Sequence, residues 1–141
     1  MTAQFAELKA QPEYSVASQS ALARKSQLFI NGKWVDSTGG DTIDILDPST
    51  ARKIGEQVDA TAEDIDRAVR AARIAFDDGR WTGLAPSMRE RLLHRLADIL
   101  ERHADELGEL ESIDNGKPLM FAKSVDLPSG LAFLRQMAGW A

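Results

Sequence analysis

The segment ELESIDNGKP, residues 109–118, places the carboxylate of Asp114 where an apolar-periodic stretch gives way to Asn-Gly and Pro. Two interpretations are open. Asn115 or Gly116 can adopt the left-handed conformation that closes a helix, and Pro118 cannot continue one, so the segment can be a helix end only. In the second interpretation, Asp114 has a further function beyond that helix end.

The other candidate groups do not form a recognisable site. His94 and His103 lie on a charged helical stretch, without a Cys or a paired carboxylate–histidine spacing to make a metal site. No G-x-G-x-x-G, G-x-S-x-G or G-x-x-x-x-G-K-[ST] motif occurs, so neither a phosphate-binding loop nor a serine nucleophile elbow is encoded. The absence of Cys excludes a disulfide and a thiol nucleophile. No catalytic or cofactor-binding residue can therefore be assigned from the residues alone.

Charge and composition exclude several classes of partner. The chain of 141 residues carries 22 acidic and 17 basic residues, with a net charge of -5. Because no cationic face is available, we expect no binding to nucleic acid or to an anionic membrane. The N-terminal segment lacks an apolar run long enough for a signal peptide or a membrane span. These features predict a soluble, cytoplasmic protein.

The first half of the chain predicts an arm followed by two hairpins. Residues 1–26 lack a sustained period apart from a weak helical hint around Phe5 and Leu8, and we expect a flexible arm there. In LFINGKWV, Asn-Gly separates two short apolar runs, which is the strongest local signal for a hairpin. A second hairpin is expected from 42–46 and a returning strand near 54–58, joined by the turn residues Asp-Pro-Ser-Thr.

The hydrophobic period then changes from two to 3.6, which predicts helices. Thr61 and Asp64 form a capping-box pattern at the start of a helix that ends near Asp78-Gly79. A leucine stripe from Leu92 to Leu110 predicts one long helix, or two in line with a break near His103. The fold class is therefore α+β, with two hairpins followed by three or four α-helices.

A further helix is expected from about Leu127, because Asp126 can cap it and Pro128 suits its first turn. This helix runs apolar to Trp140 and Ala141 without a cap or a polar tail. We interpret this ending as sequence that continues in a longer protein. The alternative is a genuinely short, noncatalytic helical interaction module.

The order of several segments resembles the N-terminal part of the NAD(P)-dependent aldehyde dehydrogenase superfamily. The resemblance extends from residue 28 to residue 141, and the segments that carry it are LFINGKWV, DPST, TAEDIDRAVRAARIAFDDGRW, RLADILERHADELGELESIDNGKP and AGWA. It is strongest to the class 1/2-like branch, and FDDGRW with MAGWA is similar to bacterial aromatic and phenylacetaldehyde dehydrogenases. Residues 27–141 would then be the N-terminal part of that domain, truncated before the cofactor-binding and catalytic segments.

The resemblance implies a parent α/β fold with a Rossmann-like cofactor domain and assembly into homodimers or homotetramers. In that family a Cys thiolate attacks the aldehyde, hydride passes to NAD or NADP, and a Glu-activated water releases the carboxylic acid. This chain departs from the pattern because the nucleophile is missing. We therefore expect the 141-residue chain to be inactive alone.

The resemblance also implies two sites on this chain. Many relatives hold a structural potassium or sodium ion, and carried over by position its ligands are the backbone carbonyls of Ile45 and Leu46 and the carboxylate of Asp114. The helix around residues 124–134 lines the aldehyde tunnel in relatives, which places Val125 and Ser129 in that tunnel. The alternative for Ser129 is a polar residue that only supports the helix start.

Overall fold

The first hairpin forms because two turn residues adopt positive φ angles. The computed structural model describes residues 14–141, and β1 (Leu28–Ile30) pairs antiparallel with β2 (Lys33–Val35). Asn31 and Gly32 between the strands have φ of 51° and 76°. A two-residue turn of this kind matches the natural twist of the strands. The predicted hairpin is confirmed.

The second hairpin is confirmed as well, and one carboxylate organises its turn. The strand β3 (Thr42–Leu46) pairs antiparallel with β4 (Lys53–Val58), with a register irregularity between Ile45 and Leu46. The buried Asp47 carboxylate accepts hydrogen bonds from the Ser49 N–H at 2.7 Å and the Thr50 hydroxyl at 2.7 Å. These bonds hold the chain reversal between the two strands.

The predicted capping box starts helix α2 (Ala62–Asp77). The Thr61 hydroxyl accepts from the Asp64 N–H at 3.2 Å, and the Asp64 carboxylate accepts from the Thr61 N–H at 3.1 Å. Two backbone donors at the helix start are thereby satisfied. The helix ends as predicted, with Gly79 at a φ of 71°.

The leucine stripe forms two helices, α3 (Pro86–Arg102) and α4 (Ala104–Asn115), with the break at His103. Gly116 follows α4 with a φ of 75°. Glycine adopts this left-handed conformation without the Cβ clash of other residues. Both the predicted break and the predicted helix end are confirmed.

The helix predicted from about Leu127 is confirmed as α6 (Leu127–Ala138). The structure adds two elements that were not predicted before it, α5 (Leu119–Phe121) and a π-helical turn η1 (Ala122–Asp126). The predicted cap at Asp126 is wrong, because its backbone is helical and its side chain makes no capping bond. The carboxylate instead accepts from the Lys117 ammonium group at 2.5 Å.

The arm expected over residues 1–26 contains a helix in its described part. Helix α1 (Val16–Leu22) packs against α4, where the Glu109 carboxylate accepts from the Ser15 N–H at 3.0 Å and the Ser18 hydroxyl at 2.6 Å. Glu109 stabilises this seven-residue helix from 91 residues further along the sequence, so a local pattern could not predict it. The helical hint around Phe5 and Leu8 lies outside the described residues.

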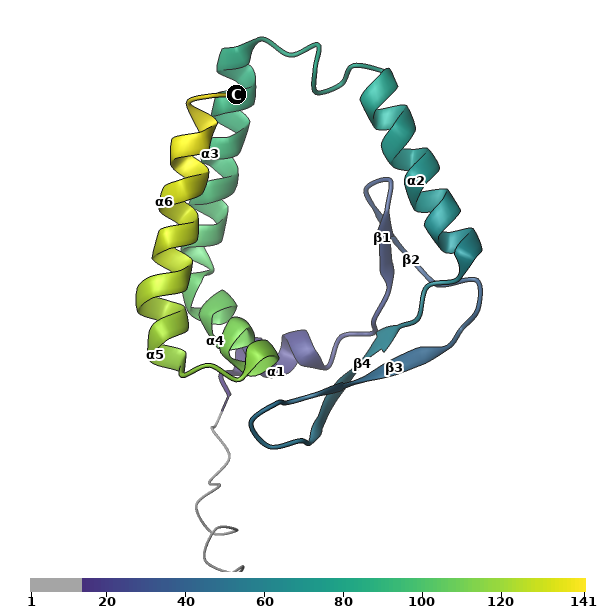
Figure 1. Ribbon diagram of the computed structural model, residues 1–141, viewed down its shortest axis with the longest axis vertical. Coiled ribbons are helices and arrows are strands. Elements are labelled where there is room, and N and C mark those ends of the chain that lie inside the picture. The colour runs from purple at the N-terminus through teal and green to yellow at the C-terminus, as the bar shows by residue number, and fades with distance from the viewer. Residues whose placement is uncertain (1–13) are drawn as a thin grey trace, which may run out of the picture.

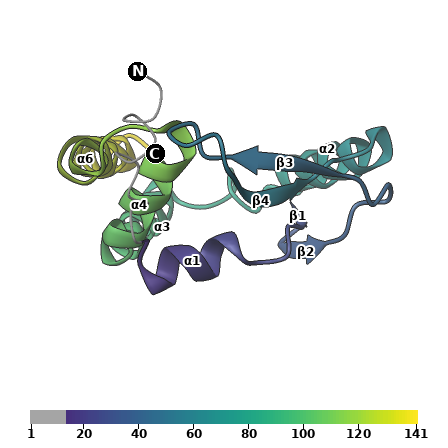
Figure 2. The same ribbon diagram turned by 90° about the horizontal axis from the view of Figure 1, so that it is seen from below.

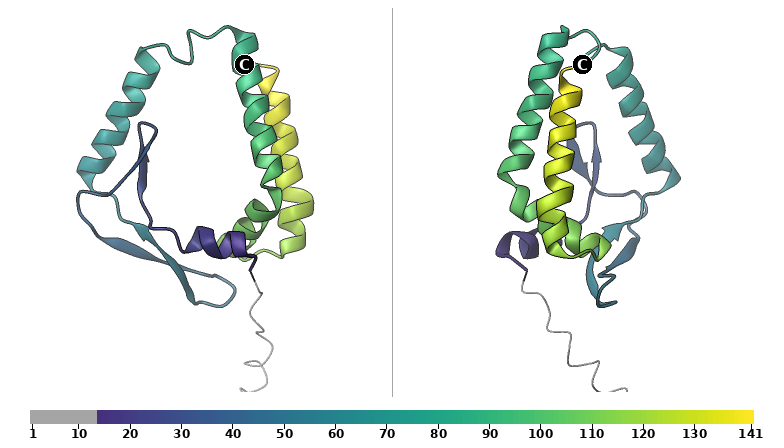
Figure 3. Two further views of the ribbon diagram at one scale, coloured as in Figure 1. Left: turned by 180° about the vertical axis from the view of Figure 1, so that it is seen from behind. Right: turned by 60° about the vertical axis from the view of Figure 1, so that its left-hand side comes forward.

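The elements form an open frame (Figure 1). Helices α3 and α6 lie side by side, and α2 stands apart from them (Figures 1 and 3). The first hairpin lies beside α2, and the second hairpin lies at the lower end of the frame (Figures 1 and 3). Seen from below, α1 bridges from α4 toward the hairpins (Figure 2). The most deeply buried apolar side chains belong to the helical side of the frame: Ala97, Ile113, Ala122 and Ala138.

None of the helices between residues 14 and 141 combines the length and the apolar character that a membrane crossing requires.

Candidate functional site at the end of helix α4

The end of α4 meets the turn of the second hairpin at close range. A Cβ built on Gly116 would lie 3.0 Å from Cγ of Pro48 and 3.4 Å from Oγ of Ser49. Glycine at this position therefore serves both the left-handed φ and the approach of the hairpin turn. This contact brings the two segments of the predicted cation site, residues 45–46 and Asp114, to one side of the molecule.

Asp47 anchors that turn from inside the protein. Burial acts to raise the pKa of this carboxyl, but the hydrogen bonds from Thr50, Ser49 and Tyr14 outweigh it and hold the pKa below its ordinary value. The Tyr14 hydroxyl donates to Asp47 at 3.4 Å, which ties the segment before α1 to the same turn. Asp47 is consequently a structural acceptor with its hydrogen-bonding capacity largely occupied.

Asp114 lies near the second hairpin, at the end of α4. It is exposed, and within residues 14–141 its carboxylate makes no hydrogen bond or ion pair. Asp114 and Ile45 line one cavity of about 370 Å³, whose remaining lining residues are mostly apolar: Leu22, Ile54, Leu107, Leu110, Glu111 and Ile113. Leu46 is adjacent in the sequence but does not line this cavity. The structure thus brings together two of the three predicted ligands.

Lys117, three residues after Asp114, joins α4 to the π turn. Its ammonium group lies 2.9 Å from Oε1 of Glu111 and 2.5 Å from Oδ2 of Asp126. The hydrogen bond to Asp126, and then the one to Glu111, raise the pKa of Lys117 above its ordinary value. The Lys117 N–H also donates to Asn115 at 2.9 Å. Lys117 is therefore held through both its backbone and its side chain.

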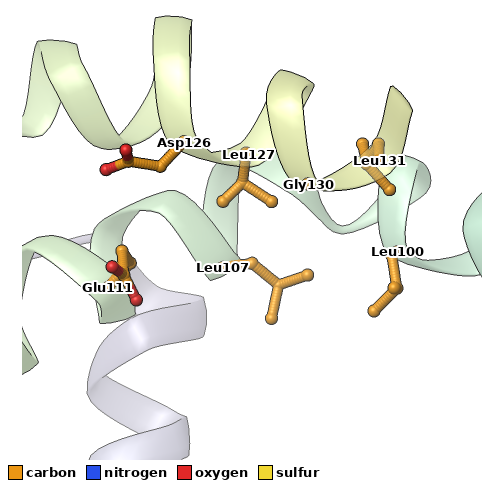
Figure 4. A pocket seen from close by; sticks show the side chains of 7 residues that line it. All are labelled: Leu100, Leu107, Glu111, Asp126, Leu127, Gly130 and Leu131. Atoms are coloured by element: carbon orange, nitrogen blue, oxygen red, sulfur yellow. The ribbon is translucent and has the colours of Figure 1, made fainter. Parts of the chain in front are cut away.

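A second cavity, of about 380 Å³, lies between α3, α4 and α6 (Figure 4). The carboxylates of Glu111 and Asp126 lie at one end of it, and leucine side chains form the rest of its walls (Figure 4). These walls comprise Leu100, Leu107, Leu127 and Leu131, with Gly130 beside them. The cavity is apolar along its length and has its only carboxylates beside the Lys117 bridge.

The two predicted tunnel residues both lie on the exposed side of the last helical segment. Val125 belongs to the π turn and is 48% exposed, and Ser129 is exposed in the first turn of α6. The Ser129 hydroxyl makes no hydrogen bond within residues 14–141. No hydrogen bond in the described chain therefore supports the alternative that Ser129 stabilises the helix start. Phe121 and Phe133 are also exposed along this segment.

The described part of the chain offers no metal cluster built from side chains. Between residues 14 and 141, no three His, Asp or Glu side chains are placed to hold one metal ion. Each histidine lies near a glutamate on its own helical stretch: His94 is 3.8 Å from Glu90, and His103 is 3.4 Å from Glu106. A cation here would therefore need backbone oxygens as ligands.

Sequence reasoning missed the polar residues that connect distant segments. Lys117 and Glu109 both belong to the segment ELESIDNGKP, whose pattern indicates a helix end and no partner elsewhere in the chain. The position of Lys117 just after the predicted helix end was the one available signal, because a cation is stabilised near the negative end of the helix dipole. Nothing in the local sequence indicates that Glu109 would bind a serine 91 residues away.

The comparisons with known proteins give one consistent result. The chain matches the aldehyde dehydrogenase family over residues 34–141. It is 43% identical over 126 residues to the mitochondrial aldehyde dehydrogenase family 2 member B4 of Arabidopsis thaliana, covering 89% of this chain and 23% of that protein. It is 37% identical over 127 residues to phenylacetaldehyde dehydrogenase of Pseudomonas fluorescens, covering 90% of this chain and 25% of that protein.

The fold is similar to solved structures over the same span. An aldehyde dehydrogenase from Bacillus cereus in complex with NAD+ superimposes with a TM-score of 0.85 at 38% sequence identity, covering 91% of this chain and 26% of that chain. The chain therefore spans about a quarter of the length of these relatives.

Proposed function

The chain belongs to the aldehyde dehydrogenase family, and we propose that it forms part of an enzyme that oxidises an aldehyde to a carboxylic acid with NAD or NADP. The observation that carries this proposal is the match over residues 34–141, in which similar sequence accompanies a similar fold. Because the chain has no Cys and no glycine-rich dinucleotide loop, the thiol nucleophile and the cofactor site would belong to sequence outside it. Its own residues would shape the aldehyde entrance and support the fold.

A chimera tests this proposal directly. Residues 34–141 replace the matching segment of the Bacillus cereus aldehyde dehydrogenase, and NADH formation is measured with acetaldehyde and phenylacetaldehyde. We expect the chimera to oxidise both aldehydes and the 141-residue chain alone to oxidise neither. A folded chimera without activity would contradict the proposal and favour a noncatalytic interaction module.

We further propose a potassium or sodium ion held by the backbone carbonyls of Ile45 and Leu46 and the carboxylate of Asp114. Three observations support it: Asp114 and Ile45 line one cavity, the Asp114 carboxylate is free of partners within the described chain, and the strand pairing is irregular between Ile45 and Leu46. Hard cations favour oxygen ligands, and an ion would offset the repulsion between Asp114 and the negative end of the α4 dipole.

Thermal unfolding in potassium chloride and in a large-cation salt tests the ion site. In the chimera, we expect Asp114→Asn to lower Tm in potassium and to remove most of the dependence of Tm on potassium. Asp66→Asn, at an exposed position on α2, is the matched control and should keep that dependence. If Asp114→Asn leaves Tm unchanged in both salts, Asp114 is a helix-end residue only.

We propose that Val125 and Ser129 line the entrance for the aldehyde. Their exposure on one segment, with exposed Phe121 and Phe133 beside them, supports an apolar surface that a substrate can pass. The small Ser129 hydroxyl leaves room for an aromatic ring. A difference of one or two methylenes changes discrimination by about 1–3 kcal/mol, so we expect a preference for arylaldehydes or phenylacetaldehyde over acetaldehyde.

The variant Ser129→Met tests the role of this position in the chimera. We expect it to lower kcat/KM for phenylacetaldehyde more than for acetaldehyde, because the longer side chain occupies space that the ring needs. An equal loss for both substrates would show that Ser129 supports the fold and does not select the substrate.

We propose that the complete enzyme is a cytoplasmic homodimer or homotetramer. Support comes from the large apolar side chains that this chain leaves exposed, such as Phe29, Trp34 and Phe76, since surfaces of this kind are commonly covered by other protein. Light scattering of the purified complete enzyme would give its subunit number, and a monomer would contradict the assembly.

A further inference from the structure

The π turn η1 is fastened to α4 at both of its ends. At its start, the Lys123 ammonium group lies 2.9 Å from Oδ1 of Asp105 on α4. At its end, Asp126 accepts from Lys117, in the loop that follows α4, at 2.5 Å. Two ion pairs of opposite polarity therefore hold a five-residue turn against one helix.

Close packing reinforces this attachment between the two ion pairs. Ala122, the first residue of the π turn, is completely buried. A Cβ built on Gly108 of α4 would lie 2.7 Å from Cγ and 3.6 Å from Cα of Lys123, so α4 has no room for a side chain at this contact. The inner side of the turn is thus fixed, and Val125 lies on its exposed side.

The wide hydrogen-bond spacing of this turn determines where Val125 points. The Leu127 N–H donates to the carbonyl of Ala122, five residues back. One extra residue in a helical turn rotates the preceding side chains by about 100° relative to an uninterrupted α-helix. Pro128 follows at once and cannot donate to the carbonyl of Ser124, so the ordinary spacing is already interrupted there. The direction of Val125 relative to Ser129 therefore depends on the π turn.

We propose that Lys117 is a positioning residue: its ion pair with Asp126 maintains the π turn and so sets the direction of Val125 at the aldehyde entrance. This inference rests on the proposed function, because it presumes that Val125 and Ser129 face the substrate. Lys117 acts without touching the substrate. Glu111 holds the same ammonium group at 2.9 Å, which fixes it between α4 and the turn.

The chain contains a matched control for this ion pair. Lys53 in the second hairpin also bridges two carboxylates, Asp44 at 2.7 Å and Glu56 at 2.6 Å. It lies on β4, away from the π turn. Lys53→Met therefore removes a lysine that makes the same kind of ion pairs. Lys117→Met and Asp126→Asn each remove the ion pair between Lys117 and Asp126, and Lys117→Arg keeps the positive charge.

Two measurements test the inference. The first is hydrogen exchange of the Leu127 amide in the 141-residue chain, which we expect Lys117→Met and Asp126→Asn to accelerate by about 10-fold or more. The second is the ratio of kcat/KM for phenylacetaldehyde to that for acetaldehyde in the chimera, which we expect both variants to change by about 10-fold, mainly through KM. Lys117→Arg should restore both quantities, and Lys53→Met should change neither.

The outcomes separate this inference from the proposed function. An active chimera whose substrate ratio is unchanged in Lys117→Met and Asp126→Asn overturns the inference and leaves the proposed function standing. An equal change in Lys53→Met also overturns it, because the effect would then be general destabilisation. An unsubstituted chimera that oxidises no aldehyde contradicts the proposed function, and the Leu127 exchange rate then decides whether Lys117 maintains the turn.

Discussion

The two sides of the frame bury different kinds of side chain. On the helical side, α3 to α6 enclose the apolar Ala97, Ile113, Ala122 and Ala138. The most buried side chains of α1, the second hairpin turn and α2 are polar: Ser18, Asp47 and Asp64. The helical side is therefore stabilised mainly by non-directional packing, whereas the hairpin side depends on directional bonds to carboxylates. The hairpin side should consequently respond to pH and the helical side to changes in side-chain volume.

The largest effect is expected from Asp64→Asn. This carboxylate, 1% exposed, accepts from the Ser37 hydroxyl at 2.6 Å and from the N–H groups of Thr38 and Thr61. These bonds, first the one from Ser37, lower the pKa of Asp64 to about 2. The amide group of an asparagine at this position would place its own N–H donors against these donors, so Tm at neutral pH should fall strongly. Asp66→Asn on the exposed side of α2 is the control and should leave Tm nearly unchanged.

The pH dependence of stability also tests the difference between the two sides, through the carboxylate of Asp64. Because its pKa is lowered from 3.8 in the folded chain, Asp64 contributes stability above pH 3.8, and this contribution is lost as the pH falls toward 2. Two variants with a single tryptophan each report on one region. When Trp81 and Trp140 are changed to Phe, the fluorescence of Trp34 reports on the first hairpin. When Trp34 and Trp81 are changed to Phe, the fluorescence of Trp140 reports on the region after α6. Acid should therefore change the Trp34 signal first. Simultaneous transitions would mean that the two sides do not differ as described.

Ala122→Leu tests the packing of the helical side. Ala122 is completely buried, and extra volume in a closely packed site costs about 1–3 kcal/mol of unfolding free energy. Ala72→Leu, at an exposed position of α2 that borders an open cavity beside the first hairpin, is the same substitution in the other region and should change stability by less than about 0.5 kcal/mol. Urea unfolding measures both. Similar losses at the two positions would remove the distinction between the regions.

Replacing two glycines by alanine sharpens the comparison further. Gly116 and Gly32 have φ of 75° and 76°, but only Gly116 has a neighbour, Pro48, within 4 Å of a built Cβ. The left-handed conformation costs alanine about 1–2 kcal/mol at either position. Gly116→Ala should therefore lower the free energy of unfolding in urea more than Gly32→Ala does. The difference is the cost of displacing Pro48. Equal losses of unfolding free energy in the two variants would show that the turn at Pro48 moves away from residue 116 at no cost.

The smallest effect on stability is expected on the apolar face of α2. Ile65 and Val69 are 54% and 61% exposed, so the double change to Lys should alter the unfolding free energy of the 141-residue chain by less than about 0.5 kcal/mol. The same change should reduce self-association, because it adds charge to an exposed apolar surface. Sedimentation velocity measures the association. A large loss of stability would mean that this face is packed in solution.

Local patterns predicted the parts of the fold that local chemistry determines. Asn31-Gly32, the Thr61–Asp64 capping box and Gly116 each act within a few residues, and all three were confirmed. Helix α1 was missed because it depends on a distant partner, and the π turn because no local pattern marks it. Glu109 holds Ser18 across 91 positions, and Lys117 draws the Asp126 carboxylate away from the cap that the sequence predicted.

The candidate site was predictable only through the family resemblance. Ile45 and Asp114 share no local pattern, and their common cavity depends on the contact between Gly116 and Pro48. Ile45 and Leu46 would contribute backbone oxygens, which leave no signature in residue types. The roles of these residues, and of Val125 and Ser129, therefore stay predictions.

The bond between Glu109 and α1 also has a consequence for biosynthesis. Ser18 leaves the ribosome 91 residues before its acceptor, a delay of roughly 5–18 s at about 5–20 residues per second. A helix of seven residues is not stable in water by itself, so α1 remains unstructured during this interval. The first described helix in the sequence is thus completed only after Glu109 has been synthesised.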